Sequence, residues 1–386
     1  MNYSDLHDLL KSILDLNQQR IKLLDEAMTI EIFEFKSAPQ AIDPKNGAAI
    51  FDTNIKAILQ DNMIEENRVF RYPVFVPSKK SSLLNPIILL HGLNERSWIK
   101  YLPWAYRLAE LTGRAVILFP IAYHMNRSPE HWGDPRKMQQ SLSDRKANFE
   151  DNNHTSFANV ALSNRLSNHP IRFFTSGRQS ANDLILLLSQ LKDGKHELFP
   201  ISCYPDFFAY SIGAFLSQIL FLANPSGLID RSKLFLFCGG AYFYEMNGIS
   251  KMIMDKVANE RITQYYLEEF KNQLIINDPL KHYFSENLIA KGFWSMIAEQ
   301  NNTTYRQKRF VKLKNQISGI SLEKDTVIPA TAISKVIPQV EMLDFDFEYS
   351  HEVPFPLGNS SAKNNVNSAF DEVFNNASDF FNNKVV

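Results

Sequence analysis

The chain has 386 residues, 45% of them apolar, and its 41 basic and 42 acidic side chains leave a formal net charge of −1. This balance excludes the strongly basic surface that a nucleic acid needs, so we expect no nucleic acid partner. The sequence has no run of 18 apolar residues, no signal peptide, no metal-ligand spacing and no phosphate loop. We therefore expect a cytoplasmic protein without a membrane span, metal or cofactor.

Residues 1–67 are expected to form an N-terminal helical extension that packs on the core. Apolar residues three to four apart predict an amphipathic helix from residue 3 to about 28. For residues 29–66 we expect an irregular wrap with one short helix near 54–61. The β-rich segment 69–77 contains two prolines, which favour an edge strand.

Strands and helices then alternate. Apolar runs at 86–90 and 115–120 predict two buried strands, with a helix over 98–111 between them. A strand, a helix and a strand at this spacing indicate a parallel crossover unit, and therefore an α/β fold with a mostly parallel central sheet. Residues 123–170 have no simple pattern, and we expect a long insertion or loop there.

The alternation resumes after this insertion. A helix is predicted over 179–191, after a turn at 176–177, and further buried strands are predicted at 207–210 and 233–238. Residues 241–305 contain several helix-like segments, for which a helical lid over the sheet is the simplest placement.

The last part of the chain returns to the alternating pattern. It predicts a short helix over 330–336, a strand around 340–345 and a terminal helix over 360–381. The core would then comprise residues 68–240 and 306–386.

Ser211 lies at the predicted junction between a strand and a helix, with Ala209 two residues before it and Gly213 two residues after it. This A-x-S-x-G pattern is typical of a nucleophile elbow, a tight turn that needs small flanking residues and aims the serine oxygen out of the sheet. A serine that only caps a helix gives the same pattern. The motif alone does not decide between these two interpretations.

Three other polar positions also follow predicted strands: Asp325 after the run that ends at Leu322, His351 after the strand around 340–345, and His91 with Gly92 after the strand at 86–90. Ligands of an open parallel sheet gather at the carboxyl ends of its strands, so these residues are expected at one rim. A serine hydroxyl needs an adjacent base to become nucleophilic, and that base needs a third group to orient it.

These features resemble the α/β-hydrolase superfamily, and the resemblance covers about residues 68–382. It implies Ser211 as the nucleophile, His351 as the general base and acid, and Asp325 as the orienting acid, with Glu323 as a close alternative. It also implies an oxyanion hole formed by the backbone N–H groups of Leu93 and Ile212.

Five further residues after strand ends are possible substrate-binding residues: His91, Asn94, Arg96, His124 and Arg127. Arg96 or Arg127 could pair with a carboxylate or phosphate of the substrate. A salt-bridge network that holds the long insertion in place is the alternative. His91 is expected to brace the oxyanion loop.

The resemblance implies a serine hydrolase that cleaves an ester, thioester or amide of a small-molecule acyl substrate through an acyl-enzyme. Two alternatives remain open. One is a non-catalytic α/β-hydrolase-fold protein that binds a small molecule or a partner, and the other is an acyltransferase that uses the same triad. The sequence predicts neither the identity of the substrate nor the oligomeric state.

Overall fold

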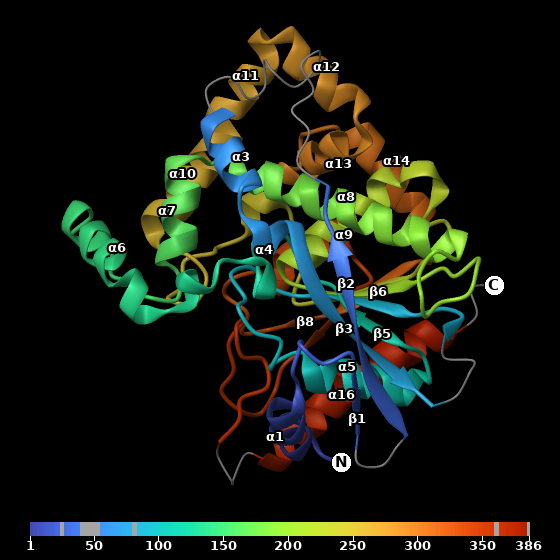
Figure 1. Cartoon of the computed structure of the whole chain (residues 1–386). Coiled ribbons are helices and arrows are strands. Elements are labelled where there is room, and N and C mark those ends of the chain that lie inside the picture. The colour runs from blue at the N-terminus through green and yellow to red at the C-terminus, as the bar shows by residue number, and fades with distance from the viewer. Residues whose placement is uncertain (24–26, 39–54, 79–82, 359–362, 384–386) are drawn as a thin grey trace.

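The computed structural model describes residues 1–23, 27–38, 55–78, 83–358 and 363–383. Within them a nine-stranded sheet runs through the centre, with helices on both faces (Figure 1). The sheet order is β1-β2-β3-β5-β4-β6-β7-β8-β9. The strands are β1 (Arg20–Lys22), β2 (Met28–Lys36), β3 (Val69–Pro77), β4 (Ile87–Leu90), β5 (Val116–Leu118), β6 (Asp206–Tyr210), β7 (Leu234–Phe237), β8 (Ile317–Leu322) and β9 (Glu341–Leu343).

The first three pairings in this order are antiparallel, and the pairings from β5 through β4 to β9 are parallel. Apart from the additional edge strand β1, this is the α/β-hydrolase fold that the sequence motifs predict. The predicted strands of the second half and the predicted helices over 330–336 and 360–381 are confirmed within one to three residues.

The strands of the parallel part are buried on both faces, which explains their continuous apolar runs. In β4, Ile88 and Leu90 belong to the core on the side of α8 (Arg172–Asp193) and α9 (Ile212–Ala223). Ile87 and Leu89 belong to the other core, which also contains residues of α1 (Tyr3–Ile13), α5 (Leu102–Thr112) and α16 (Lys363–Asn382). Alternate side chains of each strand therefore hold a different layer of helices.

The predicted helical lid contains helices, and it lies beyond α8 and α9, at the top of Figure 1. Its helices are α10 (Lys256–Gln264), α11 (Phe270–Ile276), α12 (Asp278–Glu286), α13 (Leu288–Ile297) and the start of α14 (Thr303–Leu313). The boundaries of the proposed lid, core and extension remain predictions. In the part of the chain that the structure describes, no helix has both the length and the apolar character needed to cross a membrane.

The predicted helix from residue 3 to about 28 was wrong beyond residue 13. Residues 20–22 and 28–36 are strands, and β2 pairs with β3 along its full length. The segment 28–36 therefore belongs to the central sheet. The short helix expected near 54–61 is confirmed as α3 (Ile55–Asn62), which α4 (Glu65–Arg68) follows, whereas residues 39–54 of the expected wrap lie outside the described residues.

The prediction that 69–77 is an edge strand was also wrong, because β3 lies between β2 and β5. Pro73 is opposite Ile32 of β2, whose N–H donates to Gln19 on the other side, so this pair needs no donor from the proline. The pairing with β5 involves only the two residues that follow Pro73. Proline fits inside the sheet because its missing N–H falls where no ladder bond is made.

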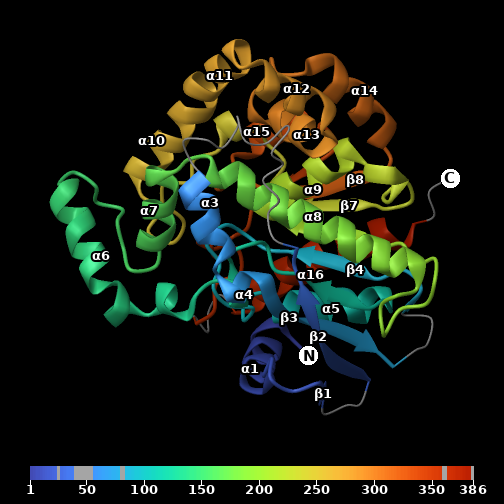
Figure 2. The same ribbon diagram turned by 45° about the horizontal axis from the view of Figure 1, so that its top comes forward.

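The segment 123–170 is more regular than expected, since it contains α6 (Pro135–Asn148) and α7 (Val160–Asn168). Helix α6 lies to one side of the molecule, away from the sheet, as Figure 2 also shows. Few of its residues are buried, so its apolar periodicity is weak. The turn predicted at 176–177 was wrong, because both residues lie inside α8; there, an added Cβ at Gly177 would meet no atom within 4 Å.

Candidate active site

Ser211 occupies a tight turn between β6 and α9, with φ 56° and ψ −120°. A backbone conformation of this kind costs about 1–3 kcal/mol and persists only where the surrounding structure enforces it. Gly213 is needed because a Cβ there would lie 2.8 Å from Leu90 Cβ and 2.9 Å from the His91 carbonyl oxygen. The turn thus has the geometry of a nucleophile elbow, packed against the end of β4.

The structure brings Ser211, His351 and Asp325 together in one chain of hydrogen bonds. Ser211 Oγ lies 2.7 Å from His351 Nε2, and His351 Nδ1 lies 2.7 Å from Asp325 Oδ2. All three side chains are at most 5% exposed. Because a carboxylate only accepts hydrogen bonds, Nδ1 carries a proton and Nε2 is directed at the serine.

Asp325 is itself held by the loop after β8. Its Oδ1 accepts hydrogen bonds from the N–H groups of Val327 and Ile328, each at 2.9 Å. Glu323, the alternative acid, is exposed, whereas Asp325 lies against the imidazole. Of the two candidate acids, Asp325 is therefore the one that contacts His351.

Two backbone N–H groups beside Ser211 are free to bind an anion. The N–H groups of Leu93 and Ile212 have no acceptor among the residues that the structure describes, and both residues line the cavity that contains Ser211. Ile212 is the first residue of α9, where backbone donors lack intrahelical partners and the helix dipole favours negative charge. These two groups fit the predicted oxyanion hole.

The loop that carries Leu93 is fixed by buried hydrogen bonds on both sides. His91 Nδ1 lies 2.8 Å from the Gly92 carbonyl oxygen, and His91 Nε2 accepts from the N–H of Ile121 at 2.9 Å. The Gly92 N–H donates to the Tyr101 hydroxyl at 2.9 Å, and that hydroxyl donates to Glu95 at 3.0 Å. His91 therefore joins this loop to the segment that follows β5.

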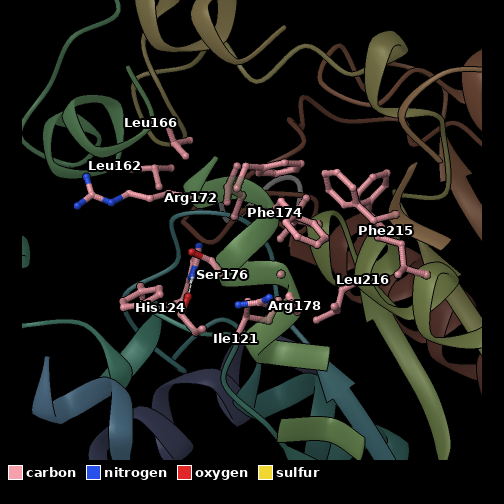
Figure 3. A pocket seen from close by; sticks show the side chains of 18 of the residues that line it. Ile121, His124, Leu162, Leu166, Arg172, Phe174, Ser176, Arg178, Phe215 and Leu216 are labelled. Atoms are coloured by element: carbon pink, nitrogen blue, oxygen red, sulfur yellow. Dashed lines mark hydrogen bonds between the residues drawn. The ribbon is translucent and has the colours of Figure 1, made fainter. Parts of the chain in front are cut away.

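Two adjoining cavities lie over the elbow. The smaller, of about 490 Å³, touches Ser211 and residues of the lid, and the larger, of about 780 Å³, extends between α7, α8 and α9. Leu93, Phe173 and Ile212 line both cavities. These volumes include the space at the mouth of each cavity that is open to solvent. Figure 3 shows the larger cavity, with His124 at one end of the row of labelled side chains and Phe215 and Leu216 at the other.

Of the five possible substrate-binding residues, His124 alone lines either cavity. His91 is fully buried in the loop contacts described above. Asn94 ties the loop after β4 to the insertion 123–170 and to the lid, since its Nδ2 donates to the carbonyl oxygens of Ala158 and Met252 at 2.8 and 2.7 Å.

The two arginines of this set lie outside the cavities. Arg127 is fully buried and forms a 2.8 Å ion pair with Asp183 of α8, so it belongs to a structural network and not to the substrate site. Arg96 donates to Asn94 at 3.1 Å and lies over the Trp132 ring. The salt-bridge alternative therefore describes Arg127.

Sequence reasoning missed the residues of α8 that form the cavity wall, among them Phe173 and Phe174. They precede the predicted start of that helix at residue 179. It also missed Tyr101, whose role depends on a hydrogen bond to a loop nine residues away. Among the described residues, no group of three His, Cys, Asp or Glu side chains could hold a metal ion.

Comparison with solved structures finds distant resemblances to several esterases. Carboxyl esterase 2 from the mycorrhizal fungus Tuber melanosporum is 11% identical, with a TM-score of 0.44 over 97% of this chain and 96% of that one. A thermostable esterase from Pseudomonas putida is 9% identical, with a TM-score of 0.42 over 100% and 92%. A cold-adapted esterase from an Arctic intertidal metagenomic library is 10% identical, with a TM-score of 0.37 over 93% and 99%.

No curated protein matches the sequence. The model of DUF6051, a family of unknown function, matches residues 1–382. The match extends from α1 to the end of α16 and so includes the sheet, both insertions and the candidate triad. The chain therefore belongs to the DUF6051 family.

Proposed function

We propose that this protein is a serine hydrolase that cleaves an ester, thioester or amide through an acyl-enzyme. The observation that carries the proposal is the hydrogen-bonded chain from Ser211 through His351 to Asp325, which begins at a strained elbow inside a cavity. Burial of the three side chains keeps water from competing for these hydrogen bonds.

Acylation follows from this geometry. Ser211 Oγ attacks the substrate carbonyl carbon while His351 Nε2 takes the hydroxyl proton. The imidazolium that forms is stabilised by Asp325, and the oxyanion is stabilised by the N–H groups of Leu93 and Ile212. Each such donor is worth about 3–4 kcal/mol of the barrier in characterised acyl-transfer enzymes. His351 then gives its proton to the leaving group.

Deacylation uses the same groups in the reverse sense. His351 takes a proton from a water molecule, the water oxygen attacks the acyl carbon, and the proton returns to Ser211 as the acid leaves. The products are the free acid and the alcohol, thiol or amine. An acceptor other than water would make the reaction an acyl transfer, and analysis of the products separates the two.

The test is covalent labelling with a fluorophosphonate probe. The wild-type protein should be labelled on Ser211. Ser211→Ala should abolish labelling without lowering the thermal unfolding temperature. Ser217→Ala is the matched control, because Ser217 lies in α9, the helix that begins directly after Ser211, and its hydroxyl donates to the Gly213 carbonyl oxygen. The proposal fails if the wild type resists the probe or if Ser211→Ala is still labelled.

A panel of p-nitrophenyl esters of graded chain length then tests turnover. A labelled protein that hydrolyses none of them over a range of pH would be reactive at Ser211 without being an esterase for this class. Turnover of thioester and amide substrates would then be measured over the same range of pH.

A further inference from the structure

Among the described residues that line the larger cavity, one side chain has a buried polar atom without a hydrogen-bond partner. His124 follows β5, is 6% exposed and lines the cavity, whose other walls are mostly hydrocarbon. Its Nε2 is buried and makes no hydrogen bond within the described residues. A buried polar atom without a partner is costly, so such an atom on a side chain that lines a cavity points to a ligand group that bonds to it.

The hydrogen-bonding character of that atom can be assigned. His124 Nδ1 lies 2.8 Å from the Ala122 carbonyl oxygen, which only accepts, so Nδ1 carries the proton. Burial lowers the pKa of His124 to about 3, and the cations of Arg96, Arg127 and Arg165 act in the same direction. The ring is therefore neutral near pH 7, and Nε2 presents a lone pair that can only accept.

The neighbouring His91 has a similar environment, but both of its ring nitrogens have hydrogen-bond partners. The two rings lie 5.4 Å apart, and His91 also directs Nδ1 to a backbone carbonyl oxygen. Its Nε2 accepts from the N–H of Ile121. Among the described residues, no N–H or O–H group donates to Nε2 of His124 in the same way. Of the two histidines, only His124 lines the cavity.

We propose that the larger cavity binds a hydrocarbon part of the substrate that carries a hydroxyl group, and that this hydroxyl donates a hydrogen bond to His124 Nε2. The inference rests on the proposed hydrolase function, since the cavity shares Leu93, Phe173 and Ile212 with the cavity of Ser211. The substrate class is then an ester, thioester or amide with a hydroxylated apolar acyl or alcohol part.

A carboxylate is a poorer match than a hydroxyl, although arginines border this cavity. Its oxygens have no proton to give and would face the lone pair of Nε2. The guanidinium groups of Arg165 and Arg172 both bind Asp61, with N–O distances of 2.9 to 3.1 Å. The donors of these two arginines are therefore already directed to a carboxylate of the protein, and Arg178, which also lines the cavity, donates to the Tyr283 hydroxyl at 3.2 Å.

The test compares esters that differ at one terminal group. One series consists of p-nitrophenyl esters of straight-chain acids of four to eight carbons that end in methyl, hydroxyl or carboxylate. A second series places the same groups on the alcohol part of butyrate esters. At the chain length that reaches His124, the wild type should prefer the hydroxyl over the methyl ester by about tenfold in kcat/KM.

His124→Phe keeps a planar ring and removes the acceptor, so it should abolish or reverse this preference in the same series. Leu162→Ile is the control, because Leu162 lines the same cavity and the change conserves volume. It should alter methyl and hydroxyl esters by the same factor. Thermal unfolding establishes that each variant is folded.

The outcomes separate this inference from the proposed function. If Ser211 is labelled by the fluorophosphonate but neither series prefers a hydroxyl, the inference is overturned and the hydrolase proposal stands. A hydroxyl preference that survives in His124→Phe, or a preference for the carboxylate esters, also overturns it. If the wild type is not labelled, the hydrolase proposal itself fails.

Discussion

The two sides of the candidate site are built in different ways. On the sheet side, Ser211, His351 and Asp325 follow three strands and bind one another and nearby backbone N–H groups. On the helical side, which α7, α8, α9, α10 and α13 form, the cavity walls are mainly apolar. The buried charges of that side tie helices together: Arg145 of α6 binds Asp255, the N-cap of α10.

This difference implies that the sheet side determines the reaction and the helical side determines the shape of the cavity. The polar groups of the sheet side have their partners within a rigid sheet edge, so changes there should alter turnover more than stability. The polar groups of the helical side join the insertion 123–170 to the lid, so changes there should alter stability or substrate preference. The predictions below test whether the two sides respond in these separate ways.

The largest effect is expected from Asp325→Asn. The amide oxygen can still accept from the N–H groups of Val327 and Ile328, but the amide does not hold His351 in the tautomer that accepts the Ser211 proton. We expect kcat for a p-nitrophenyl ester to fall about 10⁴-fold, as in other triads, with little loss of stability. Glu323→Gln, at an exposed carboxylate two residues away, should leave kcat unchanged. Equal effects of the two changes would refute the role of Asp325.

On the helical side, Arg145→Met should act on stability. Arg145 Nη2 lies 2.7 Å from Asp255 Oδ1, and both side chains are at most 3% exposed. Removing one partner leaves a buried charge unpaired, so the free energy of unfolding in urea should fall by about 3 kcal/mol. Arg136→Met, at an exposed position of the same helix, should change it by less than about 0.5 kcal/mol. Similar small losses in both variants would mean that the pair does not hold α6 to α10.

A smaller effect on the same side is a pH dependence of stability due to His124. Burial lowers its pKa from 6.5 to about 3, so below pH 6.5 the unfolded chain binds a proton that the folded protein does not. Stability from this group is therefore present above pH 6.5 and is lost as the pH falls, by about 2 kcal/mol at pH 5.

His124→Phe removes this titration. Between pH 7.5 and 5, its free energy of unfolding in urea should fall by about 2 kcal/mol less than that of the wild type. His131→Gln, at an exposed histidine, should follow the wild-type curve. Parallel curves for His124→Phe and the wild type would show that the pKa of His124 is not lowered in the folded protein.

The sheet side was largely predictable from the sequence, because strand ends and the elbow are local patterns. Ser211, Asp325 and His351 each follow a short apolar run, and parallel strands bring such positions to one edge. The choice between Asp325 and Glu323 depended only on which carboxylate turns inward after β8.

The helical side was not predictable in the same way. His124 and Arg127 are three residues apart and looked equally suited to bind substrate, but Asp183 of α8 pairs with the arginine and leaves the histidine at the cavity. No local sequence pattern predicts this contact between residues that are far apart in the chain. The strands β1 and β2 were missed for a related reason: their apolar pattern could also be helical, and the pairing of β1 with β2 and of β2 with β3 makes them strands.

The smallest effect is expected from Tyr101→Phe, which tests how the sheet side is held in place. Burial raises the pKa of Tyr101 well above 10, so its hydroxyl stays protonated; it accepts from the Gly92 N–H and donates to Glu95. Without it, Gly92 loses its acceptor and the neighbouring Leu93 N–H is less well placed for the oxyanion. We expect kcat to fall about tenfold while KM changes little, because a displaced oxyanion donor weakens the transition state more than the bound substrate. Tyr3→Phe, which removes a buried hydroxyl bound to the Phe355 carbonyl oxygen, should leave kcat unchanged. A rise in KM alone would instead place Tyr101 in substrate binding.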